Sequence, residues 1–138
     1  TLWNYITELD ASKVAINTYE DSASVTSDLM NSYAWDTAIV YIQQAGNDNY
    51  ANQSGRSINS SLANTGTNGD EVCKINDMAS NVREWTTEYS SYAYSSNAYP
   101  CVIRGGYYYN SRSYTAYRNH VIATIAGDYV GFRLSLYL

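Results

Sequence analysis

The segment Val102–Asn119 constrains this chain more than any other part of the sequence. It begins with the apolar run of a buried strand, turns at Gly105–Gly106, and continues as tyrosine, serine and asparagine with arginines between them. Nine of the sixteen tyrosines of the chain lie between Tyr89 and Tyr117. Tyrosine supplies a large contact area at little entropic cost, and serine and asparagine supply adaptable hydrogen bonds, as in antibody binding loops. The segment therefore predicts a strand that leads directly into a binding loop.

The size and charge of the chain limit its class. With 138 residues it is long enough for one domain with a core and too short for two. Hydrophobic residues make up 45% of it and charged residues 15%, which argues against disorder. A net charge of −5 argues against nucleic-acid binding, which needs a basic surface. No apolar run reaches the roughly 18 residues of a membrane-spanning helix. We expect one domain over residues 1–138, forming the C-terminal part of a longer protein, without membrane insertion.

Two cysteines and one histidine restrict the available chemistry. Cys73 and Cys101 are compatible with one disulfide or with two free thiols, and their spacing does not decide between these. A zinc-binding Cys/His pattern is absent from the sequence. His120 accompanies no recognisable nucleophile motif, so we expect a surface residue without a catalytic role.

Apolar spacing predicts two helices in the N-terminal third of the chain. The first covers residues 9–19 and has Asp10 as its cap. Its inner face is formed by Ala11, Val14, Ala15 and Thr18. The second begins with Ser32 as its cap and stops at Gly46. Its inner face is formed by Trp35, Ala38, Ile39 and Ile42.

The remaining sequence predicts a loop followed by strands. Residues 47–69 lack periodicity and form a long loop. Strand character follows at 81–87 and 101–105, around a Tyr/Ser-rich insertion at 88–100, and again in a short stretch at 121–125. Residues 131–138 alternate, and their apolar face is formed by Phe132, Leu134, Leu136 and Leu138. Two helices followed by an antiparallel, loop-rich sheet make this an α+β fold.

Three blocks in order resemble the formylglycine-generating enzyme (sulfatase-modifying factor) family. Residues 75–86 are similar to its D-M-x-G-N-V-W-E-W-T block, residues 102–108 to its R-G-G-S-W block, and Gly131–Arg133 to the start of its last strand. Residues 33–39 are similar to a helix of compact bacterial and phage-associated members. The resemblance covers residues 30–138. It implies a C-type-lectin-like fold, with two helices packed on a small antiparallel sheet with long loops.

The resemblance also implies that the catalytic activity of the family is lost. In its catalytic branch, two cysteines after the glycine pair bind copper and attack the substrate. Asn110 and Thr115 stand at the matching positions. Neither side chain replaces a thiolate as nucleophile or as soft-metal ligand. We therefore expect no enzyme activity of this type and no cofactor, with calcium as the one candidate ion.

Four residues match a calcium site of the enzyme family. They are Asp77, Ser80, Val82 and Glu84. Calcium needs a cage of about six or more oxygen ligands. The family has a glycine where this chain has Ser80, which strains the turn. A calcium site is one expectation for this cluster, and a turn or capping role for Asp77 is the other.

What the resemblance leaves is ligand recognition. Some members of this subfamily are variable proteins of diversity-generating retroelements. Their targeted residues lie near the C-terminus and are drawn mainly from Asn, Ser, Tyr, Asp, Thr, Ala and His, a set that fits residues 107–119. The expected binding face consists of Tyr107, Tyr108, Tyr109, Asn110, Ser111, Arg112, Ser113, Tyr114, Tyr117 and Asn119, flanked by Tyr92 and Tyr94.

The expected partner is a protein or carbohydrate on another cell surface, which places the protein on a phage virion or a bacterial surface. Three alternatives stay open: a lectin-like domain of fixed specificity, an enzyme with a repurposed pocket, and a structural domain of a tail or surface fibre. The framework residues have structural interpretations. Trp85 is expected in the core, and Gly105–Gly106 at a bulge or a positive φ. We expect Arg133 to pair with Glu84 or Asp128 rather than with a ligand.

Overall fold

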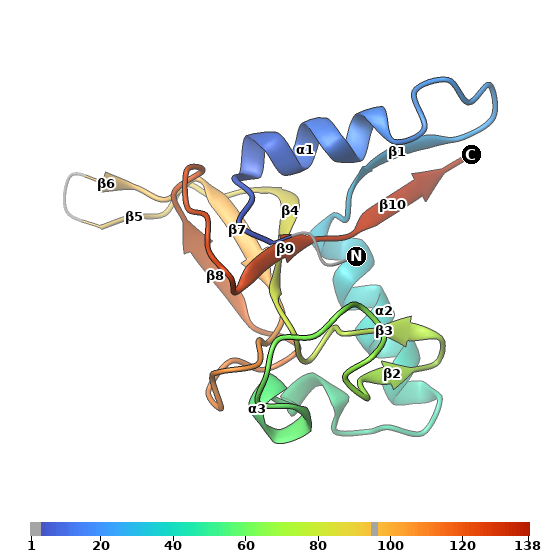
Figure 1. The fold of residues 1–138 in the computed structure, drawn as a ribbon, viewed down its shortest axis with the longest axis vertical. Helices are drawn as coiled ribbons and strands as arrows, with labels where there is room; N and C mark the ends of the chain where they lie inside the picture. Colours follow the sequence, from blue (N-terminus) through green and yellow to red (C-terminus); the bar gives the residue numbers. More distant parts are fainter. Residues whose placement is uncertain (1–3, 95–96) are drawn as a thin grey trace.

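The computed structural model describes residues 4–94 and 97–138 (Figure 1). Its helices are α1 (Glu8–Asn17), α2 (Ser32–Gln44), the 3-10 turn η1 (Tyr50–Asn52) and the short α3 (Gly55–Ile58). Its strands are β1 (Thr26–Leu29), β2 (Glu71–Val72), β3 (Ile75–Asn76), β4 (Arg83–Tyr89), β5 (Ala93–Tyr94), β6 (Asn97–Ala98), β7 (Cys101–Arg104), β8 (Arg118–Val121), β9 (Val130–Phe132) and β10 (Leu134–Tyr137). The predicted α+β class is confirmed.

The main sheet has four strands in the order β8-β7-β4-β9. β4 pairs with β7 and β7 with β8 in antiparallel fashion, whereas β4 pairs with β9 in parallel. The sheet is therefore mixed and not purely antiparallel. The parallel pair arises because the chain passes through the long loops after β7 and β8 before it returns on the other side of β4. β10 then leaves this sheet and forms a two-stranded ribbon with β1.

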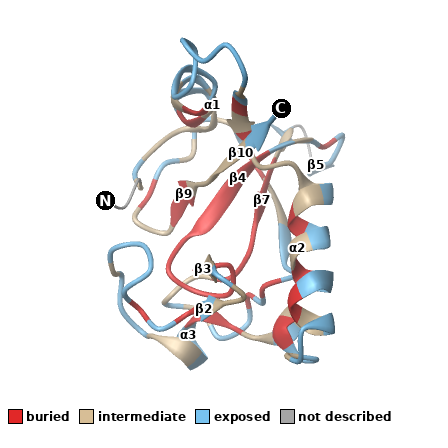
Figure 2. Cartoon of the chain, turned by 90° about the vertical axis from the view of Figure 1, so that its right-hand side faces the viewer, coloured by how far each residue is buried: buried red, intermediate tan, exposed pale blue. Residues whose placement is uncertain are grey.

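Two apolar clusters hold the elements together. The first lies under α1 and consists of Ala11, Ala15, Leu29, Trp85, Ile103, Val121 and Val130. The second lies under α2 and consists of Trp35, Ile39, Ile42, Tyr50, Met78 and Ala79. Figure 2 shows β4 and β7 buried, with the buried side of α2 turned toward the interior. Trp85 is fully buried, as predicted, and its indole Nε1 donates to the carbonyl of Ile6 over 2.9 Å.

Both predicted helices are present, with shifted caps. α1 is capped by Thr7, whose Oγ1 accepts from the amide of Asp10, so the predicted cap Asp10 lies inside the first turn. Thr18 is exposed, and its expected place on the buried face is wrong. α2 is capped by Asn31, whose Oδ1 accepts from the amide of Ala34 over 2.8 Å. Ser32 is thus the first helical residue.

The loop and strand predictions hold only in part. η1 and α3 interrupt the predicted loop at residues 47–69. The stretch at 121–125 is mostly loop, because its strand is β8 and ends at Val121. The insertion at 88–100 contains the β5–β6 hairpin, and its residues 95–96 lie outside the described residues.

The last strand differs most from its prediction. It divides at Arg133 into β9 and β10, which belong to different sheets. Leu134 packs against the core, but Leu136 and Leu138 are exposed, so their expected burial is wrong. The physical reason is that β10 follows β1 away from the main sheet. In the described part of the chain, no helix is long and apolar enough to cross a membrane.

Candidate ligand-binding surface

The tyrosine-rich loop leaves β7 through two glycines that no other residue replaces easily. Gly105 has a φ of +88°, and a Cβ there would lie 2.8 Å from the carbonyl oxygen of Met78. A Cβ on Gly106 would lie 2.1 Å from the carbonyl oxygen of Ala79. The backbone therefore passes directly against the turn that precedes β4. This close approach and the positive φ of Gly105 confirm the structural interpretation of the glycine pair.

Main-chain hydrogen bonds hold the loop in place. They run from the amides of Gly105, Tyr108, Thr115 and Ala116 to the carbonyls of Tyr117, Asn81, Gln53 and Ala51, over 2.9 to 3.1 Å. An isolated bridge between Ser54 and Tyr114 adds to them. These contacts use backbone atoms, so they do not depend on which side chains the loop carries.

The predicted binding residues divide by exposure. Tyr109, Tyr114 and Tyr117 expose 69%, 43% and 37% of their surface. Ser111 and Arg112 are also exposed. Half-buried positions are Tyr107, Tyr108, Asn110 and Asn119. We refer to Tyr107–Arg112, Tyr114 and Tyr117 as the tyrosine surface.

Ser113 lies beneath this surface and not on it. It is 2% exposed and accepts a hydrogen bond from the guanidinium of Arg83. The sequence pattern of alternating small polar and aromatic residues gave no sign of this, because the partner comes from a distant strand.

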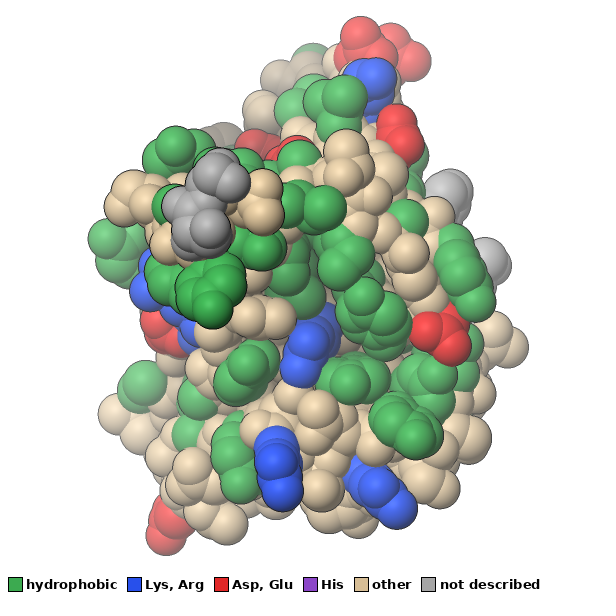
Figure 3. Space-filling view, turned by 90° about the vertical axis from the view of Figure 1, so that its left-hand side faces the viewer, with side chains coloured by type: hydrophobic (Ala, Val, Ile, Leu, Met, Phe, Trp, Pro, Cys, Tyr) green, Lys and Arg blue, Asp and Glu red, His purple; other side chains and the backbone are tan. Residues whose placement is uncertain are grey.

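Tyr92 and Tyr94 belong to the β5–β6 hairpin, which precedes β7, whereas the tyrosine surface follows it. The two therefore lie at opposite ends of this strand (Figure 1). Tyr92 stacks on His120, with ring centroids 5.0 Å apart and an interplanar angle of 21°. Figure 3 shows the face onto which the hairpin projects, where hydrophobic and uncharged polar side chains predominate over charged ones. Tyr92 and Tyr94 border this face without touching the loop in any described contact.

Arg83 on β4 supports the tyrosine surface from below. Its guanidinium carbon lies 4.5 Å from the ring centre of Tyr107 and 5.0 Å from that of Tyr117. The residue is 9% exposed, and burial lowers its pKa. Among the described residues, no carboxylate lies within ion-pair distance of it, and its Nε has no hydrogen-bond partner. Aromatic faces and one hydroxyl thus surround a buried charge.

Our sequence reasoning did not assign this role to Arg83. The one available signal was a departure from the family block, which has tryptophan between the valine and the glutamate where this chain has Arg83. An arginine at the start of a buried strand has to find partners inside the molecule.

A second set of contacts fixes the N-terminal part of the loop. The phenol of Tyr108 donates to Oδ2 of Asp128 over 2.8 Å, and this hydrogen bond raises the pKa of Tyr108. The ring of Tyr107 meets that of Tyr108 edge-on at 6.1 Å and that of Tyr129 at 5.7 Å. Tyr107 and Tyr108 are therefore held by their neighbours, whereas Tyr109 meets the ring of Tyr108 edge-on at 6.4 Å and is otherwise largely exposed.

Asn110 and Thr115, at the positions of the family's cysteines, have structural contacts. Oδ1 of Asn110 accepts from the amide of Arg112 over 2.7 Å and closes a turn. Thr115 is fully buried, and its carbonyl accepts from Nε1 of Trp35 over 3.1 Å. Both cysteines of the chain are free thiols and lie elsewhere. Cys73 packs against the cluster under α2 and Cys101 against the cluster under α1.

Three of the predicted calcium residues, Asp77, Val82 and Glu84, line one cavity of about 320 Å³. Both oxygens of Glu84 accept from Arg133, with Nε at 2.5 Å and Nη2 at 2.8 Å, which confirms the structural ion pair expected of Arg133. Burial raises the pKa of Glu84, and the nearby guanidinium opposes this rise.

Asp77 and Ser80 also have protein partners. Oδ2 of Asp77 accepts from the amide of Gly66 over 3.0 Å, and Asp77 itself has a φ of +62°, as a turn residue does. Oγ of Ser80 accepts from Nδ2 of Asn68 over 2.8 Å. Over residues 4–94 and 97–138, no three His, Cys, Asp or Glu side chains are grouped to hold a metal ion. A guanidinium holds both oxygens of Glu84, whereas Oδ1 of Asp77 and Oδ1 of Asn76 are buried and have no hydrogen-bond partner among the described residues. The calcium site and the turn role of Asp77 therefore both stay predictions.

Comparison with known proteins agrees with the fold. The family profile of the sulfatase-modifying factor enzyme 1-like domain matches residues 16–136. The crystal structure of CarF superposes with a TM-score of 0.72 at 14% identity, over 96% of this chain and 66% of that one. Variable protein 1 of Treponema denticola superposes with a TM-score of 0.54 at 19% identity, over 79% of this chain and 47% of that one. The chain thus spans less than two thirds of either structure. No curated protein matches it in sequence.

Proposed function

Because this chain belongs to the sulfatase-modifying factor enzyme 1-like domain family, whose match covers residues 16–136, we propose that it is a non-catalytic member that binds a protein ligand through the tyrosine surface. The fold it shares with a variable protein supports a binding role. The observation that carries the proposal is the exposure of Tyr109, Tyr114 and Tyr117 on a loop whose backbone is fixed. Tyrosine and arginine are enriched among the residues that dominate protein interfaces.

The loop combines a fixed backbone with replaceable side chains. Tyr109, Ser111 and Arg112 project from it, and in the described contacts the side chains of Tyr109 and Ser111 bind no part of the core. Substitution at such positions usually changes stability by no more than about 0.5 kcal/mol. A loop of this kind tolerates sequence variation at its tip, which supports the proposal that these residues are targets of diversification.

The absence of a thiol nucleophile on the loop supports a non-catalytic role. Formation of formylglycine by this family would need thiolates at the positions of Asn110 and Thr115. Both positions are instead tied into the loop's own structure, and Thr115 has no exposed surface. Cys73 and Cys101 pack against different clusters and do not form a pair.

Sequencing of the encoding locus in many isolates of its source population tests the diversification proposal. We expect codon differences at Tyr109, Ser111, Arg112 and Tyr114, and none at Gly105. A nearby imperfect repeat should differ from the gene only where the repeat has adenine. An invariant locus without such a repeat would refute diversification and leave a domain of fixed specificity.

Binding itself is tested with a panel of purified extracellular bacterial proteins displayed on beads. The variant Tyr109→Ser/Tyr114→Ser should lose the interactions of the parent chain and keep its melting temperature, because both rings are exposed. Tyr41→Ser, an exposed tyrosine on α2, is the matched control. Equal binding by the parent and the double variant would place the ligand elsewhere on the molecule.

A further inference from the structure

A cleft beside the N-terminal end of α2 is the second notable surface of the molecule. It has a volume of about 500 Å³, within the range of small-molecule sites. Its walls come from α2, from the C-terminal half of β4, and from the facing ends of β7 and β8. None of its lining residues belongs to the tyrosine surface.

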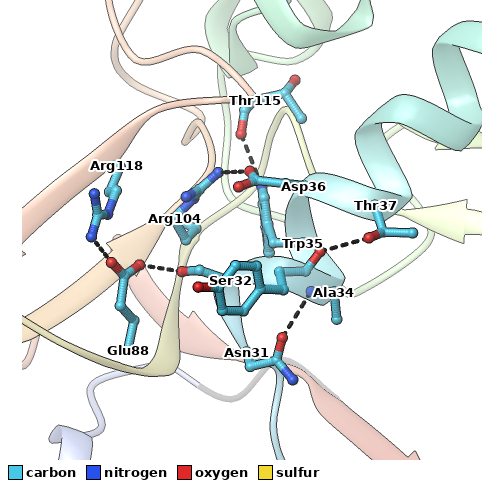
Figure 4. Close-up of polar contacts among 11 residues, drawn as sticks. Asn31, Ser32, Ala34, Trp35, Asp36, Thr37, Glu88, Arg104, Thr115 and Arg118 are labelled. Atoms are coloured by element: carbon cyan, nitrogen blue, oxygen red, sulfur yellow. Dashed lines mark hydrogen bonds and ion pairs between the residues drawn. The ribbon is translucent and has the colours of Figure 1, made fainter.

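Two ion pairs form the polar wall of the cleft (Figure 4). Arg118 pairs with Glu88, whose other oxygen accepts from the hydroxyl of Ser32. Arg104 pairs with Asp36, which is itself more than half exposed. The charges of the four ionised side chains therefore cancel within one small site.

The pairing of Arg104 is incomplete. Its side chain is 5% exposed, and its Nε has no hydrogen-bond partner among the described residues. Buried guanidinium N–H groups are usually satisfied, and an exception requires a reason. Arg104 lines the cleft, and its ion pair in the described part of the chain is the one that Nη2 makes with Asp36.

Two exposed aromatic rings border the same cleft. Tyr33 stands in the first turn of α2 and Tyr89 at the end of β4, and they expose 88% and 77% of their surface. A tyrosine presents an apolar face for packing and a hydroxyl for hydrogen bonding. Rings with this exposure are available to cover the faces of a ligand seated between them.

We propose that this cleft binds a neutral saccharide unit. A phosphate or carboxylate would meet Asp36 and Glu88, and a cation would meet the two guanidinium groups, so the balanced charge disfavours both. A sugar hydroxyl donates and accepts at once, so adjacent hydroxyls can receive hydrogen bonds from a guanidinium and give them to a carboxylate. The C–H faces of the ring then pack on the tyrosines. This assignment does not depend on the tyrosine surface or on calcium.

Saturation-transfer NMR on the whole chain tests the proposal. The probes are the methyl glycosides of glucose, galactose, mannose and N-acetylglucosamine, with acetate as the anionic probe and tetramethylammonium as the cationic probe, since both carry the methyl protons that the method detects. We expect transfer to at least one glycoside and to neither charged probe. Tyr33→Ala and Tyr89→Ala should each raise the dissociation constant of the bound glycoside about fivefold, because each removes one aromatic contact. Asp36→Asn, at an exposed carboxylate, should weaken it as well.

Two control variants separate this site from the rest of the molecule. Tyr41→Ala removes an exposed ring from the same helix outside the cleft, and Tyr109→Ser removes one from the tyrosine surface. Both should leave glycoside binding unchanged. The proposal is overturned if no glycoside receives transfer, if the cleft variants bind like the parent, or if only a charged probe binds. Loss of binding in Tyr109→Ser would also overturn it, because the sugar would then occupy the tyrosine surface.

Discussion

The contact between Arg83 and Ser113 should couple the central strand to the tyrosine surface in a way that a double-mutant cycle can measure. Arg83 is buried without a carboxylate partner, and its guanidinium is surrounded by Tyr107, Tyr117 and the hydroxyl of Ser113. The three variants are Arg83→Met, Ser113→Ala and the double variant. Methionine keeps the unbranched apolar stem and removes the charge.

The expected magnitudes follow from these contacts. Ser113→Ala leaves another donor of a buried charge without a partner and should cost about 1.5–3 kcal/mol. Arg83→Met loses the same hydrogen bond and two cation–π contacts of about 0.5–2 kcal/mol each. Removal of the buried charge of Arg83, which has no counter-ion among the described residues, stabilises the fold and offsets part of this loss. The double variant should therefore be about 1.5–3 kcal/mol more stable than the sum of the single effects predicts, because their shared hydrogen bond is lost only once.

Urea unfolding, followed by the fluorescence of the buried Trp35 and Trp85, measures these differences. Arg112→Met is the matched control, since it removes an exposed arginine from the same loop and should change stability by less than about 0.5 kcal/mol. If the single effects of Arg83→Met and Ser113→Ala add within about 0.3 kcal/mol, the two side chains are not coupled and the supporting role of Arg83 is refuted.

Three further predictions concern the framework. Gly106→Ala, whose Cβ would meet a backbone oxygen at 2.1 Å, should cost more than about 3 kcal/mol in thermal melts. Gly46→Ala, at a φ of +112° with nothing nearby, should cost only the about 1–3 kcal/mol of a strained φ. Arg133→Met leaves the carboxylate of Glu84 buried and alone and should cost about 3–5 kcal/mol. Burial raises the pKa of that carboxyl, and without the guanidinium nothing from Arg133 opposes the rise, so proton uptake relieves more of the cost as the pH falls and the loss should be smaller at pH 5 than at pH 8. Burial also raises the pKa of the Tyr50 phenol. The contribution of this phenol to the free energy of unfolding is therefore complete below about pH 10 and declines at higher pH. Alkaline unfolding should be less steep in Tyr50→Phe.

Spacing of apolar residues along the sequence predicted the helices well, because the buried face of a helix depends on neighbouring turns. The helical spacing of Trp35, Ile39 and Ile42 placed the buried face of α2 correctly, because all three side chains meet one core. The cap was misplaced by one residue, since Asn31 and Ser32 are both good caps and only the backbone decides between them.

The wrong predictions concern positions whose partner or burial is set by residues far away in the sequence. The alternation of residues 131–138 continues to Leu138, but the partner strand changes at Arg133, and a pattern of period two does not show this change. Likewise, composition led to the prediction that Ser113 is exposed like its neighbours. Ser113 is buried because its hydroxyl accepts from Arg83, which lies on a distant strand. The cleft beside α2 was also missed, because its charged residues come from segments far apart in the sequence.

The topology of the sheet has a consequence for how the chain folds. β4 receives its parallel neighbour β9, and β1 its described partner β10, from segments far along the sequence. Pairings between such distant segments form late, and chains dominated by them fold in about milliseconds to seconds and not in microseconds. Until then one edge of β4 and all of β1 remain open to pairing with other chains, so aggregation during folding is the characteristic hazard of this fold.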